Sequence, residues 1–234
     1  RSSTSVENQA YSTPAPLAYL AAIAADVGSD TLVYEPTAGN GMLLITASPQ
    51  NATANELEEN RYKSLVAQGF SAISGDALQA IESGAVLKNS QDAVVTNPPF
   101  GSIKDEDGRP KKVIVDGFRL GKIDHLIAAD ALRALKDDGK ATLIIGADKV
   151  AGGISTDDRI FFNWLYSNYN VTSHFELDGK LYVRQGAGWP VRFITIDGRK
   201  QSSRVSPAPD TIKRFNTWES VYEQFKALGT ENGS

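Results

Sequence analysis

The chain has no cysteine and only two histidines, His125 and His174, among its 234 residues. Without thiols it can form no disulfide, no thiolate zinc site and no cysteine nucleophile, and two histidines disfavour a histidine-rich metal centre. No apolar run approaches the roughly 20 residues that a membrane-spanning helix needs. The alanine-rich segment 16–27 contains polar residues and lacks a basic leader, unlike a secretory signal. We therefore expect a cytoplasmic protein with no bound metal.

Basic residues are scarce in the first 100 positions, which hold 4 of them against 10 acidic side chains. The remaining positions hold 20 basic and 18 acidic side chains, so the net charge of −4 hides an uneven distribution. The segment Leu181–Arg214 is especially basic, with only Asp197 and Asp210 as acidic residues. Such a face can bind phosphates even on an acidic protein, whereas a solvated surface is the simpler alternative. Its basic residues are Arg184, Arg192, Arg199, Lys200, Arg204, Lys213 and Arg214.

Short apolar segments alternate with helical patterns along the chain, which predicts a parallel, doubly wound α/β sheet with ligands at the carboxyl ends of its strands. Residues 102–124 have no clear period and mix glycine, proline and charge, so they are predicted to form a long loop, which in a compact domain is usually either functional or disordered. The last two predicted strands are expected to form a hairpin around the turn 185–190. The predicted strands are 31–35, 53–56, 70–74, 93–96, 141–147, 171–177, 180–184 and 191–197. The predicted helices are 14–27, 41–47, 58–68, 77–83, 123–135, 157–166 and 218–228.

Two motifs follow strands of this predicted sheet. Glu35-Pro-Thr-Ala-Gly-Asn-Gly41 follows the first strand, and Asn97-Pro-Pro-Phe100 follows the fourth. Glycines at 39 and 41 let a backbone approach a ligand closely, and the helix predicted at 41–47 would offer N–H groups to a carboxylate. The Gly-x-Gly-x-x-Gly spacing of dinucleotide sites fails at Leu44. An ordinary tight turn is the simpler alternative for each motif.

Asn97-Pro-Pro-Phe100 resembles the catalytic motif of methyltransferases that modify a planar amino or amide nitrogen, and segment 35–41 resembles their S-adenosylmethionine loop. With Tyr11-Ser-Thr-Pro14 upstream, the motif order resembles the γ arrangement of N6-adenine DNA methyltransferases over roughly residues 9–196. Those enzymes usually have an aromatic residue where this chain has Ser12. The resemblance implies a Rossmann-like methyltransferase fold, a seven-stranded, mostly parallel sheet with an antiparallel C-terminal hairpin. It also implies S-adenosylmethionine as donor, S-adenosylhomocysteine as product and flipped adenine in DNA as substrate, as in restriction-modification.

Further candidate cofactor ligands follow the second and third strands. A carboxylate at Glu56 can accept from both ribose hydroxyls, Leu57 can pack on the adenine ring, and Asp76 can accept from its exocyclic amine. The simpler alternatives are that Glu56 begins a helix and that Asp76 caps one. In the enzymes that the chain resembles, the threonine of the upstream motif contacts the methionine part of the cofactor. The predicted cofactor-binding residues are Tyr11, Thr13, Glu35, Pro36, Thr37, Ala38, Gly39, Gly41, Glu56, Leu57, Asp76, Ala77 and Asn97.

The predicted catalytic residues are Asn97, Pro98, Pro99 and Phe100. An exocyclic aromatic amine is a poor nucleophile because its lone pair is delocalised into the ring. Two acceptors aimed at its two N–H bonds, the Asn97 side-chain oxygen and the Pro98 carbonyl, would favour the localised form that attacks a methyl group. The prolines stiffen the turn, and Phe100 offers a face on which an extruded base can stack.

The chain begins at Arg1 without methionine and ends in a polar tail, so we expect a domain excised from a longer protein. We predict a methyltransferase catalytic domain over 1–200, followed by a linker and a C-terminal helix over 201–234. Related DNA enzymes usually carry a sizeable target-recognition domain after the sheet. Target recognition is therefore expected from another domain, a partner subunit or loop 102–124. More loosely, the chain is similar to methyltransferase domains that begin large phage and plasmid proteins carrying a helicase.

Three other functions fit parts of the pattern. Methyltransferases acting on release-factor glutamine also use an Asn-Pro-Pro turn, but they typically have tyrosine where this chain has Phe100, and they have a helical N-terminal domain. RNA methyltransferases acting on adenine N6 or guanine N2 also contain Asn-Pro-Pro-Phe. The third alternative is an inactive methyltransferase fold that serves as a binding module, which the retained Gly39, Glu56 and Asn97 argue against.

Overall fold

The computed structural model describes residues 13–181, 188–202 and 207–231. Tyr11, Arg184, Arg204 and the end of the strand predicted at 180–184 lie outside the described residues. Within the described ranges, no helix has both the length and the apolar composition that crossing a bilayer requires. The same ranges contain no group of three or more histidine, cysteine or acidic side chains arranged to hold a metal ion.

Within the described residues, eight strands form one sheet in the order β10-β8-β9-β7-β4-β1-β2-β3. The strands are β1 (Val33–Glu35), β2 (Ala52–Glu56), β3 (Ser71–Ser74), β4 (Gln91–Thr96), β7 (Leu135–Gly146), β8 (Tyr169–Leu177), β9 (Val191–Arg199) and β10 (Arg214–Phe215). Every neighbouring pair is parallel except those that include β9, which runs antiparallel to both β7 and β8. The predicted α/β class, a mostly parallel sheet with an antiparallel C-terminal hairpin, is confirmed, with β10 as an additional edge strand.

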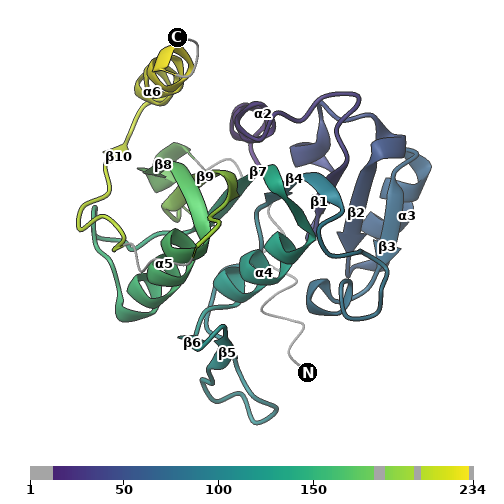
Figure 1. Ribbon diagram of the computed structural model, residues 1–234, viewed down its shortest axis with the longest axis horizontal. Coiled ribbons are helices and arrows are strands. Elements are labelled where there is room, and N and C mark those ends of the chain that lie inside the picture. Colours follow the sequence, from purple (N-terminus) through teal and green to yellow (C-terminus); the bar gives the residue numbers. More distant parts are fainter. Residues whose placement is uncertain (1–12, 182–187, 203–206, 232–234) are drawn as a thin grey trace.

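Helices cover both faces of the sheet (Figure 1). They are α2 (Ala15–Ala24), α3 (Glu59–Ala67), α4 (Ile123–Ala131), α5 (Thr156–Asn168) and α6 (Trp218–Glu231). Buried residues of α2, α3 and α6 belong to one hydrophobic cluster, and those of α4 and α5 belong to another. The alanines of α2 allow close packing on the sheet, where the Thr142 hydroxyl of β7 donates to the Ala21 carbonyl. Each face of the sheet therefore has its own core.

The order of the strands places a topological switch point between β1 and β4. From this point, β2 and β3 extend the sheet to one side and β7 extends it to the other. The two strands are parallel and in direct register, with Val33 opposite Ala93 and Tyr34 opposite Val94. The loops after β1 and β4 consequently leave the same edge side by side, at the position where open α/β sheets bind their ligands.

A two-stranded arm, residues 101–122, separates β4 from α4 and contains β5 (Val113–Val115) and β6 (Phe118–Leu120). It projects from the body of the molecule (Figure 1). The prediction of an irregular loop over 102–124 is therefore wrong for these strands. Asp116 and Gly117 both have positive φ, 48° and 84°, as a tight hairpin turn requires. An Asp-Gly pair between two short apolar runs is the sequence signal that identifies this hairpin.

Two predicted helices are much shorter than expected. The helix predicted at 41–47 is a single 3₁₀ turn, Met42–Leu44, and the one predicted at 77–83 is a 3₁₀ turn at Ala77–Gln79. Apolar runs of this length do not distinguish a full helix from one turn. Residues 41–47 therefore provide no full helix whose N-terminus could bind the cofactor carboxylate, and a single turn has almost no dipole.

The C-terminal hairpin also differs from its prediction. The partner of β9 is β8, with Leu177 opposite Val191, whereas residues 180–181 of the predicted strand lie in a 3₁₀ turn. β7 begins at Leu135 and includes the Asp-Asp-Gly segment that was expected to end a helix. β10 pairs with β8, and Phe225 of α6 packs edge-on against Phe175 and Phe193. The division of the chain at residue 200 stays a prediction.

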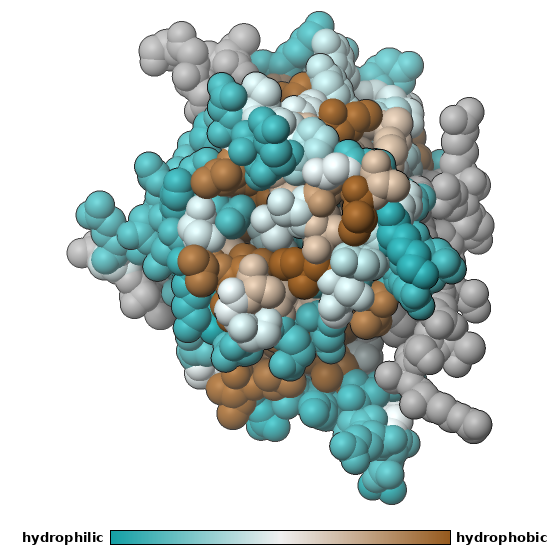
Figure 2. Space-filling model, turned by 90° about the vertical axis from the view of Figure 1, so that its right-hand side faces the viewer, coloured by the Kyte–Doolittle hydropathy of each residue, from teal (hydrophilic) through white to brown (hydrophobic). Residues whose placement is uncertain are grey.

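The sheet has β10 at one side and β3 at the other. Among the described strands, β3 pairs only with β2. Viewed onto that side, hydrophobic residues are dispersed among hydrophilic ones (Figure 2). The outer residues of β3, Ser71 and Ser74, are exposed and polar. This edge thus avoids the long apolar strand that favours edge-to-edge association.

Candidate functional site

The loop after β1 carries two glycines with left-handed backbones, and they serve different purposes. Gly39 has φ 56°, and a Cβ built there would meet no atom of the described chain within 4 Å. Gly41 has φ 81°, but its Cβ would lie 3.1 Å from the Phe70 ring and 3.2 Å from Leu65. The predicted reason for Gly41, close approach to a ligand, thus needs correction, since its missing side chain makes room for internal packing. The open side of the loop is at Gly39.

Glu56, at the end of β2, fastens this loop. Its Oε2 accepts from the Gly39 N–H at 2.8 Å, and its Oε1 accepts from the Glu58 N–H at 2.8 Å and from Arg61 at 2.9 Å. Because two carboxylate oxygens offer about four lone-pair sites, three donors leave capacity for a further one. Glu56 is therefore a structural anchor of the loop, and the helix that follows is capped by the side chain of Glu58 instead.

Asn55, the residue before Glu56, was missed by the sequence reasoning. Its buried side-chain nitrogen donates to the carbonyls of Pro36 and Gly75, at 3.0 and 2.9 Å, and its backbone carbonyl accepts from the Ala38 N–H. It therefore joins the loops after β1 and β3. An asparagine next to the end of a short strand between two glycine-containing loops is the only sequence signal for it, and that signal is weak.

The remaining predicted adenine contacts have mixed positions. Leu57 is 66% exposed although it is large and apolar, which leaves its side chain free to cover a ring. Asp76 accepts from the Leu78 N–H at 2.9 Å and so caps the 3₁₀ turn, as the simpler alternative supposed. Ala77 is buried in the core.

In the turn after β4, Asn97 meets a residue 84 positions away. Its side-chain nitrogen donates to the Thr13 hydroxyl at 3.0 Å. This bond holds the Asn97 side chain in place. Pro98 is buried, and Pro99 and Phe100 are half-buried. The structure brings Thr13 to the predicted catalytic residue, and its expected contact with a cofactor stays a prediction.

Glu35 joins the two loops at the switch point. Its carboxyl group is fully buried beside the backbone of Thr37 and Asn97, and its Oε2 has no hydrogen-bond partner among the described residues. The Thr37 hydroxyl lies 3.5 Å from Glu35 Oε1 and 3.4 Å from the Thr96 hydroxyl. Burial raises the pKa of Glu35 well above its usual value, and these hydrogen bonds only partly oppose the rise. Glu35 thereby lies between the turn after β4 and the glycine loop after β1.

Phe100 packs against the end of β7. A Cβ on Gly146 would lie 3.3 Å from Phe100 Cγ and 3.5 Å from Asp124 Oδ2, so both side chains adjoin the Gly146 backbone. The Gly146 N–H donates to Asp124 Oδ2 at 3.0 Å, and Asp124 Oδ1 is buried without a partner in the described chain. Neither Asp124 nor Gly146 was predicted as a site residue. The buried Asp124 therefore adjoins the same backbone segment against which Phe100 packs.

Asp124 should make stability depend on pH. Burial raises its pKa from 3.8 to about 7, opposed by the Gly146 N–H and by Lys122, while Asp158 adds to the rise. The pKa of Asp124 is higher in the folded state than in the unfolded state. Its contribution to the free energy of unfolding is therefore complete below about pH 4 and is lost as the pH rises to about 7. The increase in the pKa of Asp124 from 3.8 to about 7 corresponds to about 4 kcal/mol of unfolding free energy. We expect Asp124→Asn to flatten the decline of unfolding free energy between pH 4 and 7 in urea titrations.

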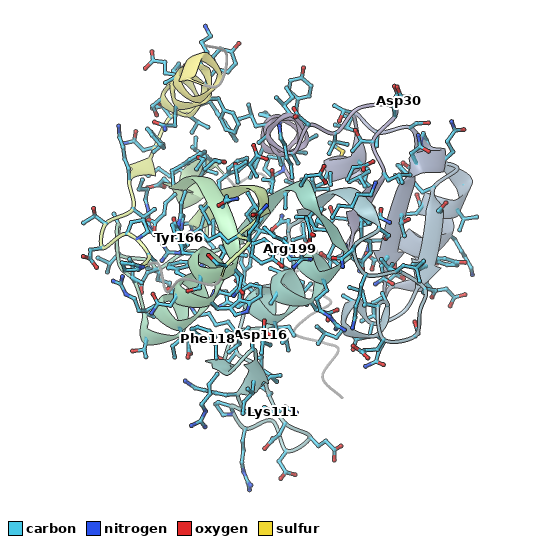
Figure 3. All side chains as sticks on the ribbon, viewed as in Figure 1. Asp30, Lys111, Asp116, Phe118, Tyr166 and Arg199 are labelled. Carbon is cyan, nitrogen blue, oxygen red and sulfur yellow. The ribbon has the colours of Figure 1, made fainter. Side chains whose placement is uncertain are left out.

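Asp30→Asn is the matched control, since Asp30 is exposed at the molecular surface (Figure 3). It should leave the pH profile unchanged. An Asp124→Asn profile as steep as that of the wild type would contradict a buried, proton-binding Asp124.

The described basic residues of the segment Leu181–Arg214 do not gather on one exposed face, as a phosphate-binding surface would require. Arg192 is fully buried and pairs with Glu176 at 2.6 Å and Asp158 at 3.3 Å. Arg199 donates to the carbonyls of Leu132 and Leu135, and Lys200 donates to that of Tyr166. Arg199 is the last residue of β9 and Lys200 follows it, and because β9 runs antiparallel to β7, both lie at the sheet edge opposite the Asn97–Phe100 turn.

The buried charges have a structural purpose of their own. Arg214 pairs with Glu176 at 2.7 Å and donates to the carbonyls of Asp148 and Lys149, while Arg192 donates to that of Gly153. These bonds hold the loop after β7, which begins one residue beyond Gly146. Removal of Arg192 or Glu176 would leave the remaining side chain of the pair charged, buried and unpaired, which is unfavourable.

Comparison of the sequence with protein-family models and with curated proteins finds no match. Solved structures do match. A protein from Listeria monocytogenes, described as a class I S-adenosylmethionine-dependent methyltransferase, has 14% identity and a TM-score of 0.62 over 94% of this chain and 72% of its own. Identity this low shows the fold alone. The chain has the S-adenosylmethionine-dependent methyltransferase fold.

Two modification proteins of type I restriction enzymes share it. One, from Vibrio vulnificus, has 12% identity and a TM-score of 0.67 over 94% of this chain and 53% of its own. The other, the EcoKI M protein, has 16% identity and a TM-score of 0.60 over 84% of this chain and 46% of its own. This chain therefore spans about half the length of these two proteins.

Proposed function

We propose that the protein transfers a methyl group from S-adenosylmethionine to the N6 amine of adenine in DNA. The observation that carries the proposal is the junction at the switch point, where Glu35 joins the Gly39 loop to the Asn97 turn. A donor site and an acceptor site must be adjacent for direct transfer, and two neighbouring loops at this junction meet that requirement if the first holds the cofactor and the second the base. The likeness in fold to restriction-modification proteins supports DNA as the substrate.

The residues around Gly39 fit the cofactor. The space beyond Gly39 would be filled by a Cβ, Glu56 has capacity for another donor, and Leu57 exposes an apolar surface. Gly39, Glu56 and Leu57 would hold its ribose and adenine, with Asp76 at the adenine edge. When bound, the cofactor supplies an electrophilic methyl group on a sulfonium. A dinucleotide is not favoured, because the third glycine of its fingerprint is missing.

The catalytic contribution of the chain is positioning and hydrogen bonding. Asn97, oriented by Thr13, and the Pro98 carbonyl would accept from the two N–H bonds of the adenine amine, which localises its lone pair. No strong base is required for attack, because the proton can leave after transfer. The buried Glu35 lies against the Asn97 backbone. This contact fixes the part of the backbone from which both hydrogen-bond acceptors project.

Phe100 would stack on the flipped base. We expect Phe100→Ala to weaken binding of a DNA duplex in which the target adenine lies opposite an abasic site. The loss should be roughly 1–3 kcal/mol, the contribution of one base–aromatic contact. Cofactor affinity should not change, since Phe100 lies on the Gly146 side of the turn. Tyr222→Ala, an exposed aromatic residue on α6, is the matched control. Equal binding by wild type and Phe100→Ala in fluorescence anisotropy would remove the stacking assignment.

The proposal is tested by offering labelled S-adenosylmethionine with DNA, RNA and protein in parallel. Label on DNA, recovered as N6-methyladenine, is the expected result. Label only on RNA or on a glutamine amide would replace the proposed substrate with one of the alternatives. Failure to bind the cofactor in calorimetry would favour a binding module. Because this chain covers about half of the modification proteins, recognition of a particular sequence is assigned to a further domain or subunit.

A further inference from the structure

A cavity of about 420 Å³ lies between the arm and the first turn of α5. Its lining is more basic than acidic, with three cationic side chains and one carboxylate. It is lined by Ser102, Pro110, Lys111, Lys112, Arg119, Gly121 and Asp157. Such a volume accommodates a phosphate group together with part of its sugar, so charge decides what the cavity favours.

The single acidic side chain of the lining is already neutralised. Lys112 donates to Asp157 at 2.8 Å. Lys111 and Arg119 have no ion pair with any described residue, and both are exposed. Two positive charges therefore remain uncompensated around one cavity, which is the arrangement that attracts a phosphate oxyanion.

The cavity is built on fixed elements. The Ile103 N–H donates to the Gly121 carbonyl, and the Ile123 N–H donates to that of Gly101, at 2.9 and 2.8 Å. At the hairpin turn, Trp164 of α5 donates to Asp116 at 2.9 Å. Figure 3 shows Lys111 on the arm, with Asp116 and Phe118 nearer the body of the molecule. The arm thus holds its cations in place against α5.

The root of the arm is close to the catalytic turn. Ser102 lies two residues after Phe100, so their Cα atoms are at most about 7 Å apart. A base extruded onto Phe100 brings the phosphates on either side of its own sugar to this region, because they are covalently attached to it.

We propose that this cavity binds a backbone phosphate of the DNA strand that carries the target base, with Lys111 and Arg119 as its ligands. The inference rests on the proposed function, because it takes DNA as the substrate. Phosphate contacts of this kind fix the register of the strand and carry no sequence information. The arm therefore positions the target nucleotide, whereas sequence recognition belongs elsewhere.

The test is binding of a short fluorescent duplex of mixed sequence across a series of salt concentrations. Arg119→Ala and Lys111→Ala should each reduce the slope of log affinity against log salt by about 1, for duplexes of any sequence. Arg109→Ala is the matched control, because Arg109 is an exposed arm arginine outside the cavity that pairs with Asp107. Its slope should equal that of the wild type.

Unchanged slopes for Lys111→Ala and Arg119→Ala, or an equal loss in Arg109→Ala, would overturn the phosphate site. A loss seen with RNA but not with DNA would overturn the commitment to DNA, as would a wild type that binds no duplex. Methyl transfer separates this result from the proposed function. Wild-type transfer to DNA with unchanged slopes refutes only the cavity, whereas slope loss without any transfer refutes only the reaction.

Discussion

Replacing Asn97 with alanine should abolish most methyl transfer while leaving S-adenosylmethionine bound. The side chain supplies one of two acceptors that localise the lone pair of the amine, and loss of one preorganised hydrogen-bonding group at a reacting centre typically costs about 10²–10³ in rate. The loss should appear in the single-turnover rate and not in substrate affinity. Calorimetry with the cofactor and quenched-flow transfer to DNA measure the two quantities separately.

The matched control is Asn60→Ala, on the exposed first turn of α3. Thr13→Val is an informative companion, because it keeps Asn97 but removes the hydroxyl that accepts from its side chain. We expect an intermediate rate for it. Transfer at the wild-type rate by Asn97→Ala would show that the turn does not act on the amine.

The second large effect concerns Glu56. Glu56→Ala should weaken S-adenosylmethionine binding by about 1.5–3 kcal/mol, the amount typical of a lost hydrogen bond to a charged group. The loss combines the ribose contact with the anchor of the glycine loop, since the same carboxylate holds the Gly39 N–H. Isothermal titration gives the affinity, and a urea titration reports whether the fold itself is weakened.

Glu56→Gln separates the two contributions, because it keeps one acceptor for the loop and removes the anionic acceptor of the ribose. Its affinity should lie between those of wild type and Glu56→Ala. Glu59→Ala is the control, since Glu59 is exposed and pairs only with Lys63 among the described residues. Equal affinities for wild type and Glu56→Ala would refute the ribose assignment.

The sheet could be predicted from the sequence because its signals are local. Most strands of the sheet contain a short apolar run, and the alternation with helices favours parallel pairing. The ends of β1, β2 and β4 were within two residues of prediction, so the motifs after them were placed on the correct edge. The errors fall where a short run can form either a helix or a turn, as at Met42–Leu44.

The fine structure of the site depends on contacts between distant segments. The bonds from Asn97 to Thr13 and from Gly146 to Asp124 join residues 84 and 22 positions apart, and no sequence period reports them. Charge counting failed for a related reason. Arg192 adds to the basic count of its segment, yet it is buried between Glu176 and Asp158. The arm, in contrast, was predictable from its Asp-Gly turn.

The most direct test of the central claim is single-turnover transfer to duplex DNA, with the modified nucleoside identified by mass. The account predicts N6-methyldeoxyadenosine from the wild type and almost none from Asn97→Ala at equal cofactor occupancy. Methyl on cytosine, no methylated nucleoside in DNA, or equal product from the two proteins would contradict it.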